Sequence, residues 1–382
     1  MRRELRGAAE VVACAAAVAS LGYAAFALAR LHALERRIGR REAAREQPRV
    51  TILKPVRGLE PELERNLRSF CVQDYPSFDV VFGVRDRDDP ALDTLRRIAA
   101  DFPERSSVVV GEGVPRHGNP KIATLAPMVA QARGDVLVIA DSDMRVTPDY
   151  LDAVVAVFAD ERTGAATCVY RGEPAAGGLA SALGAMWITE QFLPATLVAS
   201  ALEPPSYTFG STMALRRNVL EAIGGISALG DRLADDYALG RLVTERGYRV
   251  AHADYIVENS VAEPGLRALF GHELRWARTI RAVRPASYAG IVLTYPLPLA
   301  LLAALVARNR RRSLALIVPA AAVRYALHRT AHAVAATTQR PAPWLIPVRD
   351  ALGIAVWALG LIGRTVRWRD AELQVGPGGS LE

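Results

Sequence analysis

The chain has 382 residues, of which 51% are hydrophobic and 23% are charged, so it is neither a disordered polypeptide nor only a bundle of membrane helices. Its 47 cationic and 40 acidic residues give a formal net charge of 47 − 40 = +7. Three widely spaced cysteines exclude a disulfide framework and a cysteine-built zinc site, and they favour a reducing compartment.

The positive charge is concentrated beside apolar segments. Seven arginines and three glutamates fall within residues 30–49, and four arginines fall within residues 308–312. Each cluster borders an apolar run, as the cationic flanks of membrane helices do. A nucleic-acid-binding domain spreads its cations over one face among aromatic residues, so no nucleic-acid partner is expected.

The N-terminal segment is predicted to cross a membrane. Residues 11–29 contain no charge, close to the roughly 20 residues that a spanning helix needs. A cleaved signal peptide is the alternative, because Ala27-Leu28-Ala29 resembles a cleavage site. The length of the run and the arginines after it favour an uncleaved anchor, with the arginine-rich side in the cytoplasm.

The segment that follows predicts an α/β domain with a mostly parallel sheet. Short apolar strands are expected at residues 50–53, 80–84, 107–110 and 136–140, and helices at residues 60–72, 89–102 and 120–132. Continuously apolar strands with helical crossovers indicate a sheet that is covered on both faces. Ligands of such sheets bind beyond the carboxyl ends of the strands. Neither a dinucleotide-binding glycine motif nor a P-loop occurs.

Aspartates follow two of these strands. Asp86 ends one, and Asp141 with Asp143 follows another. Two carboxylates one residue apart can bind one hard divalent cation, whose remaining ligands a diphosphate can supply. A helix cap or a solvated turn is the alternative for such a short motif.

Two further motifs carry candidate chemistry. Asp235 and Asp236 precede a helical pattern, where they are either helix caps or a pair that includes a base for a hydroxyl proton. Residues 272–281 place Arg275, Arg278 and Arg281 on one helical stripe, suited either to a leaving diphosphate or to a membrane interface.

Lysine occurs at only two positions, Lys54 and Lys121, against 45 arginines (47 − 2). Both lysines are expected at the ligand edge of the sheet, although chance retention explains them as well.

The C-terminal third has three apolar stretches, at residues 286–307, 313–327 and 342–363. Pro296 and Pro298 interrupt the first, which is predicted to dip into the cytoplasmic leaflet and return. The other two are predicted to cross outward and back, which leaves Arg364, Arg367 and Arg369 inside.

In combination, these motifs resemble family-two-type glycosyltransferases of the GT-A fold, and within them the ceramide glucosyltransferase-like branch. The resembling residues run from Val50 to about Leu302. They are Leu53 to Gly58, Gln73 to Pro76, Val84 to Pro90, Asn119 to Lys121, Asp141 to Asp143 and Leu233 to Tyr237. Phe209 to Arg216, His272 to Arg281 and Tyr295 to Leu299 are most similar to the bacterial hopanoid-biosynthesis-associated glycosyltransferases.

The resemblance implies a role for each matching residue. Asp86 and Asp141 would contact the donor nucleotide, Asp141 and Asp143 would hold Mg²⁺ or Mn²⁺, and Asp236 would be the catalytic base. Lys54, Lys121, His272, Arg275 and Trp276 complete the predicted donor-binding set. His272 stands where the family motif has Gln or Arg, so its equivalence is open. No histidine occurs between His117 and His252, whereas eukaryotic ceramide enzymes carry one in the segment that matches residues 187–192; this difference favours a hopanoid acceptor.

The predicted function is therefore an inverting, membrane-bound transfer of a sugar, N-acetylglucosamine above others, from a UDP-sugar to a lipid hydroxyl of bacteriohopanetetrol. A ceramide glucosyltransferase, a polyprenyl-phosphate glycosyltransferase and an inactive membrane scaffold are the alternatives. The apolar segment 178–202 is either core or, with the proline-interrupted stretch, the lipid slot.

The predicted domains are an anchor and linker (1–48), a GT-A catalytic domain (49–284), a C-terminal membrane region (285–369) and a tail (370–382). The predicted location is the bacterial inner membrane, with the catalytic domain facing the cytoplasm.

Overall fold

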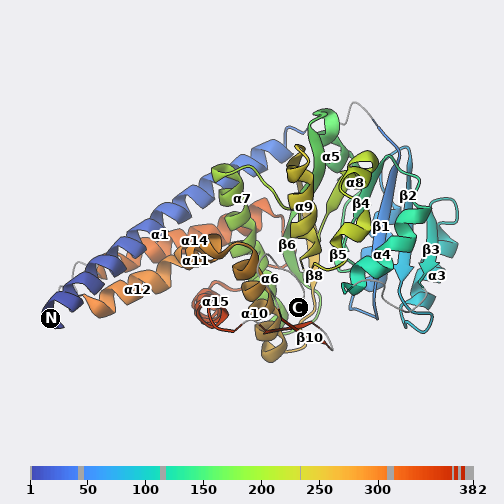
Figure 1. Cartoon of the computed structure of the whole chain (residues 1–382). Coiled ribbons are helices and arrows are strands. Elements are labelled where there is room, and N and C mark those ends of the chain that lie inside the picture. Colours follow the sequence, from blue (N-terminus) through green and yellow to red (C-terminus); the bar gives the residue numbers. More distant parts are fainter. Residues whose placement is uncertain are drawn as a thin grey trace.

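A computed structural model describes residues 2–41, 47–111, 118–232, 234–307, 314–363, 365–368 and 371–374. The predicted arginine cluster at 308–312, Arg364, Arg369 and residues 375–382 of the tail lie outside the described residues. Figure 1 shows a sheet domain at one end and a long N-terminal helix, α1 (Arg2–Ile38), that leads away from it beside C-terminal helices.

The centre of the molecule is an eight-stranded mixed sheet that is mostly parallel, as predicted. Its order is β3-β2-β1-β4-β7-β6-β8-β5. The strands are β1 (Val50–Val56), β2 (Phe78–Val84), β3 (Ser106–Val110), β4 (Val136–Ile139), β5 (Met144–Arg145), β6 (Thr163–Pro174), β7 (Met213–Arg216) and β8 (Arg249–Val261). The first four strands in this order run parallel, and β7 is antiparallel to both of its neighbours.

The predicted strands and helices of the first half are confirmed within a few residues. Their helices are α2 (Leu63–Cys71), α3 (Leu92–Asp101) and α4 (Pro120–Gln131). Side chains alternate across the strands: Ile52 joins a core cluster on one face, while its neighbour Leu53 joins a separate cluster on the other. Both faces are therefore buried, as continuously apolar parallel strands require.

The helices of the second half cover the sheet and build the region beside it. They are α5 (Tyr150–Ala156), α6 (Leu179–Trp187), α7 (Leu193–Leu202), α8 (Arg217–Ala222), α9 (Asp235–Glu245), α10 (Leu266–Val283), α11 (Pro285–Gly290), α12 (Pro296–Val306), α14 (Ile317–Val334) and α15 (Ile346–Gly360). A π-helical turn, η2 (Ile188–Phe192), joins α6 to α7. The short strands β9 (Thr365–Trp368) and β10 (Ala371–Gln374) form a separate hairpin.

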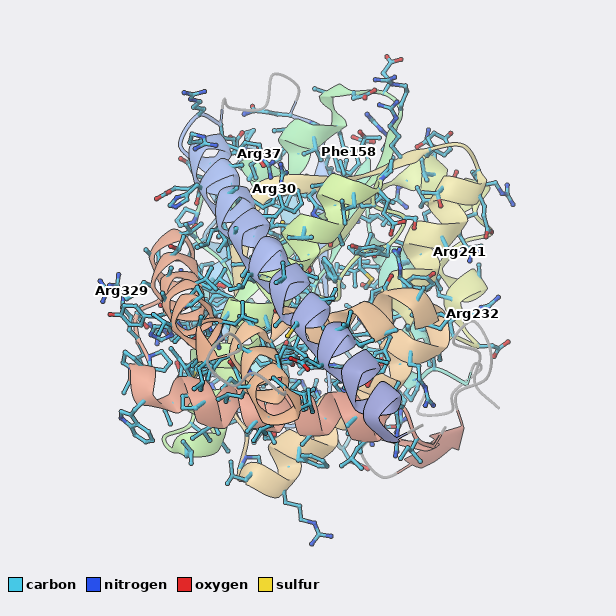
Figure 2. All side chains as sticks on the ribbon, turned by 90° about the vertical axis from the view of Figure 1, so that its left-hand side faces the viewer. Arg30, Arg37, Phe158, Arg232, Arg241 and Arg329 are labelled. Carbon is cyan, nitrogen blue, oxygen red and sulfur yellow. The ribbon has the colours of Figure 1, made fainter. Side chains whose placement is uncertain are left out.

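Helix α1 packs along α12, α14 and α7. Buried Ala24, Ala27 and Leu31 meet α7 and α14 in one apolar cluster. At the end of α1 nearest the sheet domain, where Figure 2 labels Arg30 and Arg37, the Arg37 Nε donates to Asp254 Oδ1 over 2.8 Å. Arg41 Nη2 pairs with Asp149 Oδ2 over 2.5 Å, so ion pairs as well as packing hold α1 to the sheet domain.

Within the described residues, one helix is long and apolar enough to cross a membrane, Gly7–Ile38, and it contains the predicted segment 11–29. Pro285–Thr294 and Pro296–Val306 form an apolar pair bent by 78°, which places a break where the prolines predicted one. Neither α14 nor α15 meets the same test, so the described residues do not support the predicted outward and return crossings.

Helix α15 is also short, at 15 residues, and both α14 and α15 bury charged side chains on their packed faces. Arg324, His328 and His332 of α14 and Arg349 and Asp350 of α15 are all buried. Arg349 donates to both oxygens of Glu273 on α10, at 2.6 and 2.7 Å, and to the Leu183 carbonyl of α6 at 3.2 Å. These helices are thus fixed to the rest of the fold by bidentate ion pairing rather than by apolar packing alone.

Removing one partner of this buried pair is expected to destabilise the protein strongly. Glu273→Gln leaves the Arg349 guanidinium buried without its counter-charge, which costs roughly 3–5 kcal/mol. Thermal unfolding in detergent measures the loss as a fall in Tm.

The double variant Glu273→Leu with Arg349→Met should recover most of that loss, because it leaves no buried charge. Glu245→Gln, which breaks an exposed pair with Arg241, is the matched control and should cost about 0.5 kcal/mol or less. A Glu273→Gln protein as stable as this control would contradict the buried coupling.

Candidate active site

The parallel pairing of β1 and β4 brings the predicted aspartates to one edge of the sheet. Leu53 and Ile139 are in register, so Lys54 and the segment Ala140 to Asp143 follow side by side. The backbone N–H of Asp141 donates to the Gly210 carbonyl at 3.0 Å, which ties this edge to the loop before β7. The carboxyl ends of the strands are thus the ligand edge that the fold class predicts.

Asp236 reaches the same edge from the start of α9. Its Oδ1 accepts from the N–H of Tyr237 at 2.7 Å, and its Oδ2 accepts from the N–H of Gly210 at 3.3 Å. Burial and the neighbouring charge of Asp235 raise the pKa of Asp236 to about 7. A carboxylate with this pKa accepts a proton near neutral pH more readily than an ordinary aspartate.

Gly210 contacts both Asp141 and Asp236: its carbonyl accepts from the Asp141 N–H, and its own N–H donates to Asp236. A Cβ at this position would lie 2.1 Å from Asp141 Oδ2, closer than any real contact. A side chain here would therefore push the Asp141 carboxylate away from its present position.

Asp143 offers the oxygen atoms that a divalent cation needs. Its Oδ2 accepts from the Asn259 amide at 2.8 Å, while its Oδ1 is buried and without a hydrogen-bond partner. Burial and the charges of Asp141 and Glu60 raise the pKa of Asp143 to about 7. An unpartnered buried carboxylate oxygen beside a second carboxylate fits a hard cation such as Mg²⁺ or Mn²⁺.

Lys121 lies between two carboxylates. Its Nζ is 2.8 Å from Asp141 Oδ1 and 3.0 Å from Asp235 Oδ2. Burial acts to lower the pKa of Lys121, but Asp141 and Asp235 outweigh it and hold that pKa above its ordinary value. Asp235, which the sequence analysis considered together with Asp236 but did not include in the predicted site, therefore belongs to this acidic cluster.

Lys54 is not among the residues that line the cavity, so its predicted contact with the donor stays a prediction. Its side chain is fully buried, and its Nζ donates to the Asp141 carbonyl at 2.5 Å and lies 3.7 Å from the centre of the Phe70 ring. Burial lowers the pKa of Lys54 to about 7. The hydrogen bond from Lys54 thus helps to fix the position of the Asp141 backbone.

Asp86 lies near the edge but is not among the residues that line the cavity. Its carboxylate pairs with Arg85 at 2.9 Å, and Arg85 does line the cavity. The predicted contact of Asp86 with the donor nucleotide stays a prediction.

The predicted motif on α10, residues 272–281, borders the cavity. His272, Arg275 and Trp276 all line it. His272 Nδ1 lies 2.6 Å from Glu263 Oε1, and Trp276 stacks on Trp187 with ring centres 5.1 Å apart. The predicted stripe does not act as one surface, because Arg281 binds the carbonyl of Gly363 instead.

The cavity has a volume of about 2330 Å³ and joins two different surroundings. Its lining includes Asp141, Asp143 and Asp236 of the acidic edge, and it also includes Tyr23 of α1 and Tyr295 just before α12. Between them the wall is aromatic, with Tyr170, Trp187, Phe192, Tyr207, Phe209 and Trp276 among its residues.

The predicted lipid-slot segment divides between wall and core. Trp187 and Phe192 line the cavity, together with Leu202. Leu183 and Leu197 are instead buried in two different apolar clusters. Residues 178–202 thus contribute both to the core and to the cavity wall, and the predicted lipid slot stays a prediction.

The chain belongs to glycosyl transferase family 21, because the model of that family matches residues 12–381. It is similar to ceramide glucosyltransferase 1 of Caenorhabditis elegans, with 26% identity over 62% of this chain and 51% of the relative. It is also similar to a ceramide glucosyltransferase of Gibberella zeae, with 33% identity over 32% of this chain and 25% of the relative. The chain spans about half the length of the two curated relatives from C. elegans.

Among solved structures, the mannosyltransferase PcManGT from Pyrobaculum calidifontis, in complex with GDP-Man and Mn²⁺, shares the fold. The TM-score is 0.53 at 22% identity, over 92% of this chain and 99% of that chain. The likeness supports the predicted GT-A architecture.

Filling the space at Gly210 is expected to disable the acidic edge. In Gly210→Ala the new methyl group displaces the Asp141 carboxylate, so binding of Mn²⁺ with UDP, the predicted ligand of this edge, should weaken about tenfold or more. Isothermal titration of the folded protein measures the change.

Gly177→Ala is the control, because nothing lies within 4 Å of its added Cβ. Equal affinities for the two variants would show that Asp141 does not depend on the space at Gly210.

Proposed function

We propose that this protein transfers a sugar from a nucleoside-diphosphate sugar, a UDP-sugar above others, to the hydroxyl group of a membrane lipid, with inversion at the anomeric carbon. The observation that carries the proposal is the single cavity that runs from Asp141, Asp143 and Asp236 to Tyr23 of α1. Its acidic end suits a cation-bound diphosphate, and its aromatic and apolar end suits a lipid.

Asp236 is the base in this proposal. Its carboxylate would take the proton of the acceptor hydroxyl as that oxygen attacks the anomeric carbon and the UDP leaves. The hydrogen bonds from Gly210 and Tyr237 fix its orientation, and its pKa near 7 suits proton transfer at neutral pH.

Asp141 and Asp143 would hold the Mg²⁺ or Mn²⁺, which supplies positive charge opposite the diphosphate. Lys121 and Arg275 line the cavity beside them and would stabilise the negative charge of the leaving group. Trp276 and His272 would form the wall of the donor pocket, with Glu263 orienting the imidazole.

The proposed acceptor is a hydroxyl group of a membrane lipid. Membership of family 21 and the similarity to ceramide glucosyltransferases favour ceramide over bacteriohopanetetrol as that lipid. The hopanoid alternative, with N-acetylglucosamine as the sugar, keeps its support from the sequence motifs at residues 209–216 and 272–281. A polyprenyl phosphate is the remaining lipid alternative.

The proposed domains follow from the same observations. Residues 49–284 form the catalytic domain, α1 is the anchor, and α12 with its bent partner lies at the membrane surface. The packing of α1 against α7, α12 and α14 favours its retention in the mature protein. We place the protein in the bacterial inner membrane with the catalytic domain in the cytoplasm.

A crossed transfer assay tests the function. Detergent-purified protein with Mn²⁺ is given UDP-glucose or UDP-N-acetylglucosamine together with ceramide or bacteriohopanetetrol, and mass spectrometry identifies the lipid product. A hexosylceramide supports the ceramide acceptor, and an N-acetylhexosamine adduct of the hopanoid supports the alternative. Failure to bind any UDP-sugar would overturn the proposal in favour of an inactive scaffold.

Asp236→Asn is expected to lower kcat by about 10²- to 10⁴-fold, because the amide cannot take the hydroxyl proton. Binding of UDP should change little, and calorimetry measures it directly. Asp93→Asn, which alters a highly exposed carboxylate, is the control and should leave kcat unchanged. Loss of UDP binding by folded Asp236→Asn protein would contradict the assignment of Asp236 as the base.

The pH dependence of kcat/KM should report the same carboxylate. Because a base must be deprotonated and the pKa of Asp236 is about 7, activity should fall below pH 7, by about tenfold for each further unit of pH. Asp235→Asn removes a charge that raises this pKa, so the acid limb should move to lower pH. An acid limb at the same pH in both proteins would contradict the electrostatic coupling.

A further inference from the structure

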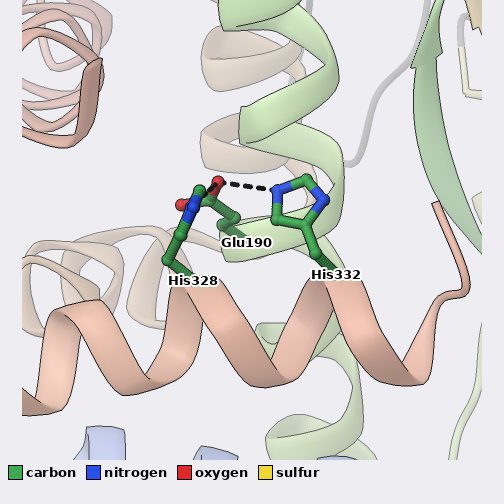
Figure 3. Close-up of side chains that lie close together, drawn as sticks. All are labelled: Glu190, His328 and His332. Atoms are coloured by element: carbon green, nitrogen blue, oxygen red, sulfur yellow. Dashed lines mark hydrogen bonds and ion pairs between the residues drawn. The ribbon is translucent and has the colours of Figure 1, made fainter. Parts of the chain in front are cut away.

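A second polar cluster lies outside the cavity, buried between η2 and the C-terminal helices. Glu190 of η2 faces His328 and His332 of α14, and the side chains of all three are almost completely inaccessible to solvent. Figure 3 shows the two imidazole rings directed at the same carboxylate. His328 Nδ1 lies 2.8 Å and His332 Nε2 lies 3.0 Å from Glu190 Oε1.

The donor atoms are those of a transition-metal site. One carboxylate oxygen and two imidazole nitrogens lie within 4.8 Å of one another. The histidines are four residues apart on one helix, the spacing that places two imidazoles on the same face. Ligand atoms about 2.0–2.1 Å from a tetrahedral Zn²⁺ are roughly 3.3 Å apart, and the two distances from Glu190 Oε1 to the imidazole nitrogens, 2.8 and 3.0 Å, are close to that separation.

Further contacts orient these ligands. Arg324 Nη1 donates to the other oxygen of Glu190 at 2.7 Å, which leaves Oε1 toward the imidazoles. His332 Nδ1 lies 2.8 Å from Thr337 Oγ1, so its Nε2 is held toward Glu190. Outer hydrogen bonds of this kind fix the ring orientation and tautomer of metal-binding histidines.

The charge of the cluster also favours a cation. Glu190 and Asp350 carry two negative charges, and Arg324, which binds both, carries one positive charge. The neighbouring Arg349 is already paired with Glu273. With both imidazoles neutral, the buried network holds one excess negative charge, which either a bound cation or a proton on one imidazole compensates.

We propose that Glu190, His328 and His332 bind one Zn²⁺-type cation that is distinct from the cation of the acidic edge. The mixed nitrogen and oxygen ligands select Zn²⁺ or Co²⁺, whereas the oxygen ligands Asp141 and Asp143 select Mg²⁺ or Mn²⁺. The bound ion joins η2 to α14. Because Gln191 and Phe192 follow Glu190 directly and line the cavity, the ion fixes the position of that wall.

Metal analysis of the full-length protein tests the proposal. The protein is purified without a histidine tag, freed of weakly bound metal with a chelator, equilibrated with Zn²⁺ and analysed by mass spectrometry. We expect about one Zn²⁺ per chain, and about one also in the Asp141→Asn, Asp143→Asn double variant. Wild-type protein that is folded and holds no Zn²⁺ after equilibration would overturn the proposal and indicate a proton in place of the ion.

Variants identify the ligands. His328→Gln and His332→Gln should each lower Zn²⁺ affinity at least about tenfold, whereas His32→Gln, which alters an exposed histidine of α1, should not. Zn²⁺ content unchanged in both ligand variants would assign the ion to another site.

If the ligand variants do not fold, wild-type protein loaded with Co²⁺ still decides the question. Tetrahedral Co²⁺ with imidazole ligands gives visible absorption bands, which the His32→Gln control should share. A spectrum of octahedral, oxygen-only coordination would contradict the proposed ligand set.

Discussion

The crowding of carboxylates at one edge of the sheet is the constraint on which the rest of the site depends. Asp141, Asp143, Asp235 and Asp236 come from two separate segments and line one cavity. Burial, with the repulsion of neighbouring carboxylates, raises the pKa values of Asp143 and Asp236, so this arrangement is unfavourable unless positive charge is near. Lys121 supplies such charge from the first turn of α4, and a divalent cation with a diphosphate would extend it.

The same constraint accounts for the two lysines of an arginine-rich chain. An ammonium group is compact and reaches between two carboxylates, or fits beneath one backbone carbonyl, where a planar guanidinium with five donors does not. Lys121 occupies the first kind of position and Lys54 the second. Chance retention is therefore the weaker explanation of their presence.

Much of the first half of the fold could be predicted because its signals are local. Apolar strands such as β1 and β4 alternate with amphipathic helices, and parallel strands bring their carboxyl ends together without further information. The convergence of Asp141 and Asp236 required more than periodicity, and the family resemblance supplied it. The place of Lys54 could not be predicted, because its position at the end of β1 does not reveal whether the side chain points into the cavity or beneath it.

The C-terminal helices show where a sequence pattern is insufficient. The stretches at 313–327 and 342–363 are apolar enough to resemble membrane spans, yet both contain a buried arginine. Arg324 pairs with Asp350 and with Glu190, which are 26 and 134 residues away, and Arg349 pairs with Glu273, 76 residues away. Local hydropathy assigns each arginine to a flank or a surface, because the partner that makes its burial possible lies on another element. Glu190 likewise could not be predicted as a metal ligand from the sequence, because the two histidines beside it lie 138 and 142 residues further along the chain.

The length of α1 has a geometric consequence. Its 37 residues extend for about 56 Å at the usual helical rise, nearly twice the thickness of the hydrocarbon core of a bilayer. Arg37 in its last turn and Arg41 just beyond it pair with Asp254 and Asp149 of the sheet domain, so this end of the helix is joined to that domain. If the N-terminal half of α1 lies in a membrane, the C-terminal half spans the distance between the membrane and the sheet domain. The number of residues in that half therefore sets how far the acidic edge lies from the membrane surface.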